Sequence, residues 1–319
     1  MIKKTLLILT SAIALLANAS AFTDVTLTGG NFTAGPFKGQ SVATFKVGDA
    51  ETTLTDWNTG IANAATLGFS IATPTAGGAS FPVENVSWYD AVKWCNLASI
   101  NAALMPVYQT ASIPVASVTR NSTTATATTT NAHGLSTGNH VTIAGATPAG
   151  YNLTTAVTVA STTTFTYTVN GSLTTPATGT ITAGVIYKTG EVIPTVNASA
   201  NGYRLPTEKE WQWAAIGGDS QSTFIFSGNN TASVVAWSRT NSPTGAKAVK
   251  TKAANTKALY DLSGNVFEWC FDDLAGVVGR RVRGGGWVVD EDSCQISIRG
   301  YSQPARQESG FGFRVFTNN

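Results

Sequence analysis

Hydrophobic side chains recur at helical spacing in two short stretches of the chain. Each stretch begins with a Ser/Thr-x-x-acid sequence, at residues 87–90 and 207–210, which is the form of a helix capping box. The apolar positions that follow are Ala91, Val92, Cys95 and Ala98 in the first stretch, and Trp211, Ala214 and Ala215 in the second. This spacing predicts two helices, with Cys95 facing the core.

Alternation of apolar and polar residues with a period of two marks three other segments, at residues 140–143, 156–159 and 164–169. Glycine, proline and asparagine residues separate them, as expected for turns between strands. The pattern predicts a small β-sheet. A disordered threonine-rich linker is the alternative, but aromatic and β-branched residues at strand spacing favour a packed sheet.

The composition of the chain changes abruptly around these strands. Between Arg120 and Lys188 the chain has no Asp, Glu, Lys or Arg and is rich in threonine. We therefore predict an all-β module at residues 113–184, inserted into a host domain made of residues 22–112 and 185–319. Insertion at an exposed loop costs the host little, because loop-closure entropy grows only with the logarithm of loop length.

The rest of the host reads as short strands and turns. Glycines at 29 and 30 and the stretch 32–45 predict an initial hairpin, and residues 312–316 predict a closing strand. With two helices and little other regular structure, the host belongs to the α+β class.

The N-terminus has the pattern of a secretory signal peptide. Lys3 and Lys4 precede an apolar run at residues 6–17, and small residues follow up to Ala21. The run is shorter than the roughly 20 apolar residues that span a bilayer, so we expect cleavage near Ala21 rather than a membrane span. A buried N-terminal helix or a membrane anchor is the alternative. The prediction places residues 22–319 outside the cytoplasm, either secreted or periplasmic.

Charge and cysteine content narrow the range of partners and cofactors. Charged residues make up 12% of the chain and the net charge is +2, which leaves no basic stripe for nucleic acid or for an anionic membrane. Cys95, Cys270 and Cys294 are the only cysteines, so one disulfide at most can form in an oxidising compartment. The spacing does not determine which two would pair.

Five motifs of the host occur in an order that resembles the formylglycine-generating enzyme family, also called sulfatase-modifying factors. They are Val-Ser-Trp-Tyr-Asp-Ala at 86–91, Tyr-Arg-Leu-Pro-Thr-Glu at 203–208, Leu-Ser-Gly-Asn-Val-Phe-Glu-Trp at 262–269, Arg-Gly-Gly-Gly-Trp at 283–287 and Gly-Phe-Arg-Val at 312–315. The resemblance implies a variant of the C-type lectin fold with two helices and a twisted antiparallel sheet near the C-terminus. The inserted module lies outside it.

The chain departs from the family at the residues that bind copper. Active members bind copper(I) through two cysteines and oxidise a cysteine of a sulfatase to formylglycine. Counted forward from Trp287, the two positions are Val289 and Cys294; counted backward from the arginine motif, the second becomes Glu291. The first cysteine is missing on either count, so we expect no copper oxidase site. The alternative is an oxidase with an altered site, in which Cys294 would be the catalytic residue.

Two other metals are implied by relatives of this family. One branch holds iron with histidines, but the chain has only His133 and His140, both in the predicted module, which excludes a three-histidine site in the host. Family members also hold calcium around the Gly-Asn-Val-Trp-Glu-Trp turn, which makes Asn265 and Glu268 candidate ligands because calcium prefers oxygen. In the alternative, both side chains hydrogen-bond to neighbouring backbone amides.

The C-terminal segment carries aromatic and charged residues where relatives place substrate-facing side chains. The candidate ligand-binding residues are Trp287, Asp290, Glu291, Asp292, Tyr301, Gln303 and Arg306. Aromatic and arginine side chains are common anchors of interfaces. We therefore predict a protein that binds a partner protein or surface ligand and has no oxidase activity, against the alternatives of an ordinary polar loop or a formylglycine-generating oxidase with an altered site.

Overall fold

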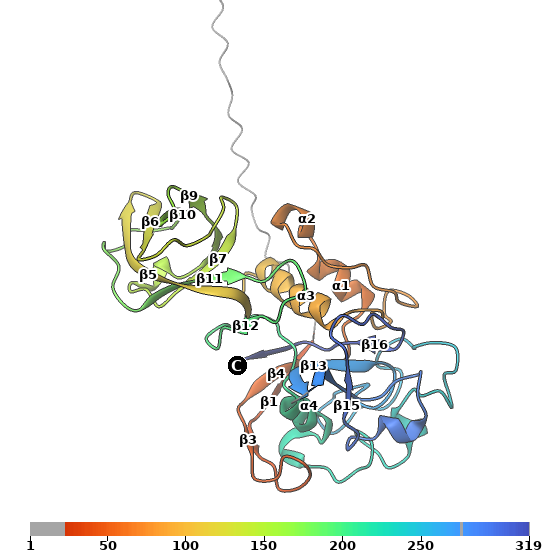
Figure 1. The fold of residues 1–319 in the computed structure, drawn as a ribbon. Helices are drawn as coiled ribbons and strands as arrows, with labels where there is room; N and C mark the ends of the chain where they lie inside the picture. Colours follow the sequence, from red (N-terminus) through yellow and green to blue (C-terminus); the bar gives the residue numbers. More distant parts are fainter. Residues whose placement is uncertain (1–22, 275–276, 319) are drawn as a thin grey trace, which may run out of the picture.

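The computed structural model describes residues 23–274 and 277–318, and it divides into a host body and a β-module (Figure 1). The predicted signal peptide lies outside the described residues. In order, the host helices are α1 (Leu54–Gly60), α2 (Ala64–Leu67), α3 (Trp88–Asn101), α4 (Glu208–Ala215) and α5 (Ala232–Val235). No helix in the described ranges is long and apolar enough to cross a membrane.

Both predicted helices are present, and each begins at its expected cap. The Ser87 hydroxyl accepts a hydrogen bond from the Asp90 amide at the start of α3. Thr207 and Glu210 form a reciprocal capping box at the start of α4. These caps satisfy backbone amides that have no partner within the helix, which fixes where each helix begins. Cys95 lies in the core, as predicted.

Three small sheets complete the host. The first has the strand order β1 (Asp24–Leu27), β4 (Phe45–Gly48) and β17 (Phe316–Asn318). The second has the order β15 (Gly300–Ser302), β14 (Val277–Arg283), β13 (Phe267–Leu274) and β16 (Phe311–Gly312). The third is the hairpin of β2 (Gly30–Asn31) and β3 (Ser41–Val42). The hairpin confirms the N-terminal prediction. The predicted closing strand 312–316 is wrong as one element, because β16 ends at Gly312 and β17 begins at Phe316. Between them the Phe313 carbonyl accepts a hydrogen bond from Thr52, which lies in neither sheet, and the Val315 carbonyl accepts one from Gly48, the last residue of β4.

The β-module is a single sheet that curls on itself. Its strands follow the order β8 (Thr154–Ala156), β7 (His140–Ala144), β11 (Ile181–Ile186), β5 (Tyr108–Asn121), β6 (Thr124–Thr129), β10 (Thr164–Thr168) and β9 (Thr158–Val159). In addition, β12 (Thr195–Val196) pairs with β5. The two end strands, β8 and β9, are separated only by Val157, so the chain itself joins the two edges of the sheet. Such closure leaves few exposed edges.

The module has its own hydrophobic core. Val118, Val141, Ile143, Phe165 and Ala183 are among its fully buried members. The strands predicted at 140–143, 156–159 and 164–169 are present, although a break at Val157 divides the second into β8 and β9. The packed core argues against a disordered linker, because a linker buries too little apolar surface to offset its conformational entropy.

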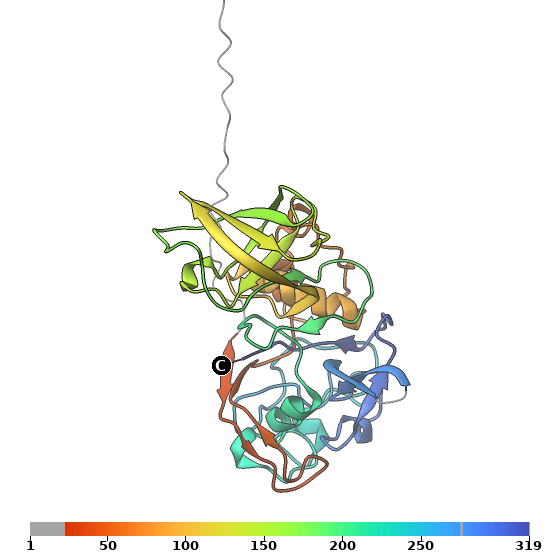
Figure 2. The same cartoon turned by 60° about the vertical axis from the view of Figure 1, so that its left-hand side comes forward.

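One buried side chain of the host holds both connections to the module. Asn96, on α3, donates from Nδ2 to the Tyr108 carbonyl at 2.8 Å and to the Tyr187 carbonyl at 2.9 Å, and its Oδ1 accepts from the Tyr108 amide at 3.0 Å. Tyr108 begins β5 and Tyr187 directly follows β11. The strands that enter and leave the module are therefore fixed to one point of the host, and Figure 2 shows the module seated close to α3.

The host core is built on tryptophans. Trp57 and Trp94 stack with ring centroids 5.9 Å apart, and Phe313 meets Trp94 edge-on at 5.3 Å. All three are buried, and aromatic pairs of this kind add about 0.5–1.5 kcal/mol each beyond the area that they bury.

Candidate functional site

The C-terminal segment between Gly284 and Gly310 is fixed at both ends by one carboxylate. Glu84, itself buried, accepts a hydrogen bond from the Trp287 indole at 2.8 Å and another from the Gly310 amide. The Trp287 amide also donates to the Asn265 carbonyl at 2.8 Å. Trp287, a predicted ligand-binding residue, is half-buried and serves chiefly to hold the segment in place.

The three predicted acidic residues form an exposed patch. Asp290 caps the short 3₁₀ helix η3 (Glu291–Cys294), whose first turn contains Glu291 and Asp292. All three are exposed, and Asp290 forms an ion pair with Arg239 at 3.7 Å. Because both partners of that pair are solvated, it contributes little to stability. These carboxylates are therefore accessible to a ligand.

Tyr301, Gln303 and Arg306 are exposed on the other half of the segment. Tyr301 is 58% exposed and lies in β15, directly opposite Arg281 of β14. Gln303 and Arg306 follow in a loop, where Arg306 forms an ion pair with Glu308. The predicted residues thus lie on separate supports: η3 carries the acids, whereas β15 and the following loop carry the rest.

The loop after β15 is tied to the start of α3. The Pro304 carbonyl accepts from the Trp88 amide at 2.9 Å, and the Glu308 carbonyl accepts from the Asn85 amide at 3.1 Å. Gln307 donates to the Asp90 carboxylate at 3.1 Å. A loop without regular secondary structure is therefore held at several points along its length, so its exposed side chains project from a fixed backbone.

Arg281, the register partner of Tyr301, belongs to an ionic cluster that sequence reasoning missed. Glu208, at the start of α4, meets Arg281 at 3.4 Å, Arg283 at 3.1 Å and Arg299 at 2.6 Å. Arg281 and Arg283 alternate along β14 and so point to the same face of the sheet. That alternation was the only signal in the sequence, because the carboxylate comes from a distant helix.

Opposing effects act on the Glu208 carboxyl group. Burial alone would raise its pKa, but the hydrogen bonds from Arg299 and the charges of Arg283, Arg299 and Arg281 lower the pKa below its ordinary value. Arg283 has no exposed side-chain surface, and its guanidinium also lies over the Trp211 ring at 4.6 Å. Glu208 is therefore ionised at neutral pH and compensates a fully buried cation.

Cys294, the candidate catalytic residue of the oxidase alternative, is a core residue. It is fully buried among Phe226, Val235 and Ala236, and burial raises the pKa of its thiol to about 12. A nucleophilic or metal-binding cysteine must be a thiolate, so this environment opposes both roles.

The residues present do not fit a two-cysteine copper site. Cys95, Cys270 and Cys294 are all free and buried, and each belongs to a different hydrophobic cluster of the host. Val289 occupies the position of the missing first ligand and packs against the Cys294 cluster. A valine side chain offers no donor atom to a metal. The disulfide that the cysteine count allowed is also not formed.

We expect the three thiols to resist modification in the native protein. With a pKa of about 12, roughly one Cys294 side chain in 10⁴ is a thiolate at pH 8, and burial raises the pKa values of Cys95 and Cys270 as well. A disulfide reagent at pH 8 should therefore label none of them within minutes, and all three after unfolding in guanidinium chloride. Rapid labelling of native Cys294, located by mass spectrometry, would contradict this environment.

The two candidate calcium ligands are engaged by protein groups. Both Glu268 oxygens accept hydrogen bonds from Arg314, and one also accepts from the Trp211 indole at 2.8 Å. The Asn265 side-chain oxygen accepts from the Lys247 amide at 2.9 Å. Among the described residues there is no group of three His, Cys, Asp or Glu that could hold a metal ion. These two side chains, as placed, do not fit a calcium site.

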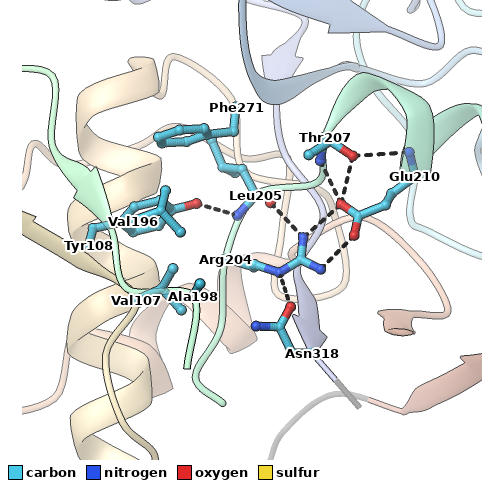
Figure 3. Close-up of a pocket in the computed structure, with 10 residues that line it drawn as sticks. All are labelled: Val107, Tyr108, Val196, Ala198, Arg204, Leu205, Thr207, Glu210, Phe271 and Asn318. Atoms are coloured by element: carbon cyan, nitrogen blue, oxygen red, sulfur yellow. Dashed lines mark hydrogen bonds and ion pairs between the residues drawn. The ribbon is translucent and has the colours of Figure 1, made fainter. Parts of the chain in front are cut away.

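A pocket of about 260 Å³ lies between the host and the start of the module (Figure 3). An Arg204–Glu210 ion pair at 2.7 Å borders it, and Tyr108 and Phe271 stack at 5.2 Å along another side. Arg204 also donates to Asn318 at 2.9 Å and to the Leu205 carbonyl. Because these internal bonds engage all three of its nitrogens, Arg204 supports the fold here. No pattern in the sequence indicated this pocket.

Comparison with known proteins agrees with this architecture. A family model described as the sulfatase-modifying factor enzyme 1-like domain matches residues 15–319. The crystal structure of CarF aligns with 94% of this chain, and the alignment includes 100% of the CarF chain, with a TM-score of 0.64 and 21% sequence identity. That likeness confirms the predicted α+β fold class.

Two curated relatives match parts of the chain. A protein named chaperone protein LppX, from Paenibacillus barcinonensis, is 36% identical over an alignment of 128 residues, and the match covers 33% of this chain and 46% of that protein. The mouse protein named inactive C-alpha-formylglycine-generating enzyme 2 is 28% identical over an alignment of 148 residues, and the match covers 38% of this chain and 48% of that protein. The chain thus spans less than half the length of either relative.

Proposed function

The chain belongs to the sulfatase-modifying factor enzyme 1-like domain family, and we propose that it is a binding member of that family without copper oxidase activity. The proposed contact surface is the C-terminal surface, defined as Asp290, Glu291, Asp292, Tyr301, Gln303 and Arg306. Its partner is a protein or another surface ligand, met outside the cytoplasm after cleavage near Ala21.

The observation that carries this proposal is an exposed set of side chains on an anchored backbone. Glu84 holds both ends of the segment, and the start of α3 holds the loop between them. A surface that is already ordered loses little conformational entropy when it binds, which favours affinity. Tyr301 adds a large amphipathic side chain of the kind that dominates binding energy at interfaces.

The buried thiols support the absence of oxidase chemistry. Cys294 is enclosed and protonated, and Val289 stands where a second thiolate would be needed. The mouse relative, which is named as an inactive enzyme, supports the idea that the fold persists without turnover. A relative named as a chaperone supports a role that depends on contact with other proteins.

The oxidase alternative is tested by copper(I) binding together with turnover. Wild-type protein and Cys294→Ser are titrated with copper(I) against a chromogenic chelator, and both are incubated with a Cys-x-Pro-x-Arg peptide under oxygen. We expect neither protein to compete with the chelator and neither to convert the peptide. Tight copper binding that depends on Cys294, accompanied by formylglycine in the peptide, would replace the binding proposal with an oxidase.

The binding proposal is tested with two surface variants, Tyr301→Ala and Arg306→Ala. Both side chains are exposed, so the variants should fold normally, and Thr119→Val on the module serves as the control. The immobilised proteins are exposed to the extracytoplasmic fraction of the producing cells, and captured proteins are quantified by mass spectrometry. We expect at least one partner retained by wild type and control but reduced at least tenfold by either surface variant. If the wild type, the control and the two surface variants all retain the same proteins equally, the C-terminal surface is not the binding site.

A further inference from the structure

A second cavity, of about 380 Å³, lies where the module meets the host, away from the C-terminal surface. The module contributes side chains from β5, β7 and β11, and the host contributes the stretch from Thr195 to Ser199, which begins with β12. Its volume is within the usual range for small-molecule sites. No charged residue lines it.

The floor of the cavity is a row of small side chains across the sheet. Ser112 of β5 is the register partner of Gly184 on β11, Gly184 is the partner of Thr142 on β7, and Thr142 is the partner of Thr154 on β8. The hydroxyls of Thr142 and Thr154 lie 2.9 Å apart. Hydroxyl-bearing side chains therefore flank a hollow at Gly184, and the Gln109 side chain enters it.

Gln109 occupies part of this hollow. It is 93% buried, as 7% of its surface remains exposed, and its side chain lies so close to Gly184 that a Cβ there would stand 2.0 Å from the amide nitrogen. Within the described part of the chain, its carboxamide has no hydrogen-bond partner, although it lines the cavity. Neither carboxamide atom is among the fully buried polar atoms that lack a partner, so both reach the solvent in the cavity and are open to a ligand there.

We propose that this cavity binds a small neutral saccharide. Serine and threonine hydroxyls both donate and accept, and the Gln109 carboxamide offers both functions as well, which matches the hydroxyl groups of a sugar. The absence of charge disfavours phosphates, carboxylates and amines, because nothing would compensate their charge after burial. Ala111, Ala144 and Val196 supply apolar wall for the C–H faces of the ring.

A peptide fits the same cavity poorly. Extended peptides bind chiefly by adding a strand to a free sheet edge. Here β11 lies between β5 and β7, and β5 lies between β11 and β6, so the backbone groups of the floor are already paired within the sheet. Recognition must therefore come from side chains, which suits a ligand that carries many hydroxyl groups of its own.

The test uses the full mature chain and saturation-transfer NMR. The probes are glucose, N-acetylglucosamine, maltose and cellobiose, with glucosamine and glucuronate as charged counterparts. The variants are Ser112→Ala, Thr182→Val and Gln109→Leu, and Thr119→Val is the matched control, because Thr119 lies on β5 outside the cavity. Ser112 is exposed and Thr182 is half-buried, so their variants keep the proposal testable if Gln109→Leu misfolds.

We expect at least one neutral sugar to give a saturation-transfer signal with the wild type and with the control. The charged counterparts should give signals that are several-fold smaller. Ser112→Ala and Thr182→Val should each raise the dissociation constant of that sugar at least fivefold. The proposal is overturned if none of the four neutral sugars binds, if the charged sugars bind equally well, or if the cavity variants bind like the control. Because Tyr301 lies outside this cavity, Tyr301→Ala should leave sugar binding unchanged, which separates this test from that of the C-terminal surface.

Discussion

Replacing Glu268 with glutamine is expected to lower the free energy of unfolding by about 3–5 kcal/mol. The side chains of Glu268 and Arg314 have no exposed surface, and they pair at 2.8 Å. Arg314 also donates to the Gly48 and Tyr260 carbonyls, so the guanidinium is held in place when the carboxylate charge is lost. The variant therefore leaves a buried cation without the carboxylate that is hydrogen-bonded to it.

Thermal unfolding followed by circular dichroism measures this loss, with Glu291→Gln as the control because Glu291 is exposed. A loss of 3–5 kcal/mol is a large fraction of a typical stability and lowers Tm by about 10 °C. The double variant Glu268→Gln with Arg314→Met should recover part of the loss, because it removes the unpaired charge. A change in Tm as small as that of Glu291→Gln would contradict the buried pair.

The same experiment separates an ion pair from a calcium ligand. If Glu268 holds Arg314, a chelator should leave the Tm of the wild type unchanged, and added calcium should not stabilise it. If Glu268 held calcium, the chelator would reproduce the loss caused by Glu268→Gln, because metal binding adds to the stability of the folded state. We expect the first result.

Local signals in the sequence predicted local structure correctly. A capping box is complete within four residues, so α3 and α4 could be placed from the sequence around Ser87 and Thr207. The predicted closing strand failed because its two ends belong to different sheets: Gly312 pairs with β13, and Phe316 pairs with β4. Arg314 turns into the core to meet Glu268, and the backbone on either side bonds to the segment that includes Gly48. A pattern of period two does not distinguish one strand from two short ones.

The candidate site was only partly visible for a related reason. Tyr301 and Arg306 could be proposed as exposed residues from the family resemblance, because relatives place substrate-facing side chains in this segment. The anchors of the segment come from distant residues such as Glu84. The role of Cys294 depended on its neighbours: three apolar side chains from the region around α5 make it a core residue. Such contacts have large sequence separation and leave no periodic signal, so only the fold reveals them.

Glu208→Gln is expected to cost about 3–5 kcal/mol at neutral pH, because three arginines converge on that one carboxylate. Arg283 is the critical partner, since its side chain has no exposed surface. Glutamine keeps the size and one acceptor oxygen of glutamate but removes the charge. The control is Glu308→Gln, which removes the partly exposed ion pair with Arg306 and should cost no more than about 1 kcal/mol.

The pH dependence of stability distinguishes a lost charge from a packing defect. The pKa of Glu208 is lower in the folded protein than the ordinary glutamate value of 4.5, so its stabilisation is present above that value and is lost as pH falls through the folded pKa. Urea titrations of wild type and Glu208→Gln should therefore differ most at pH 7 and converge toward pH 3. A difference that stays constant from pH 7 to pH 3 would mean that Glu208 stabilises the fold through its shape, and that the three arginines need no carboxylate between them.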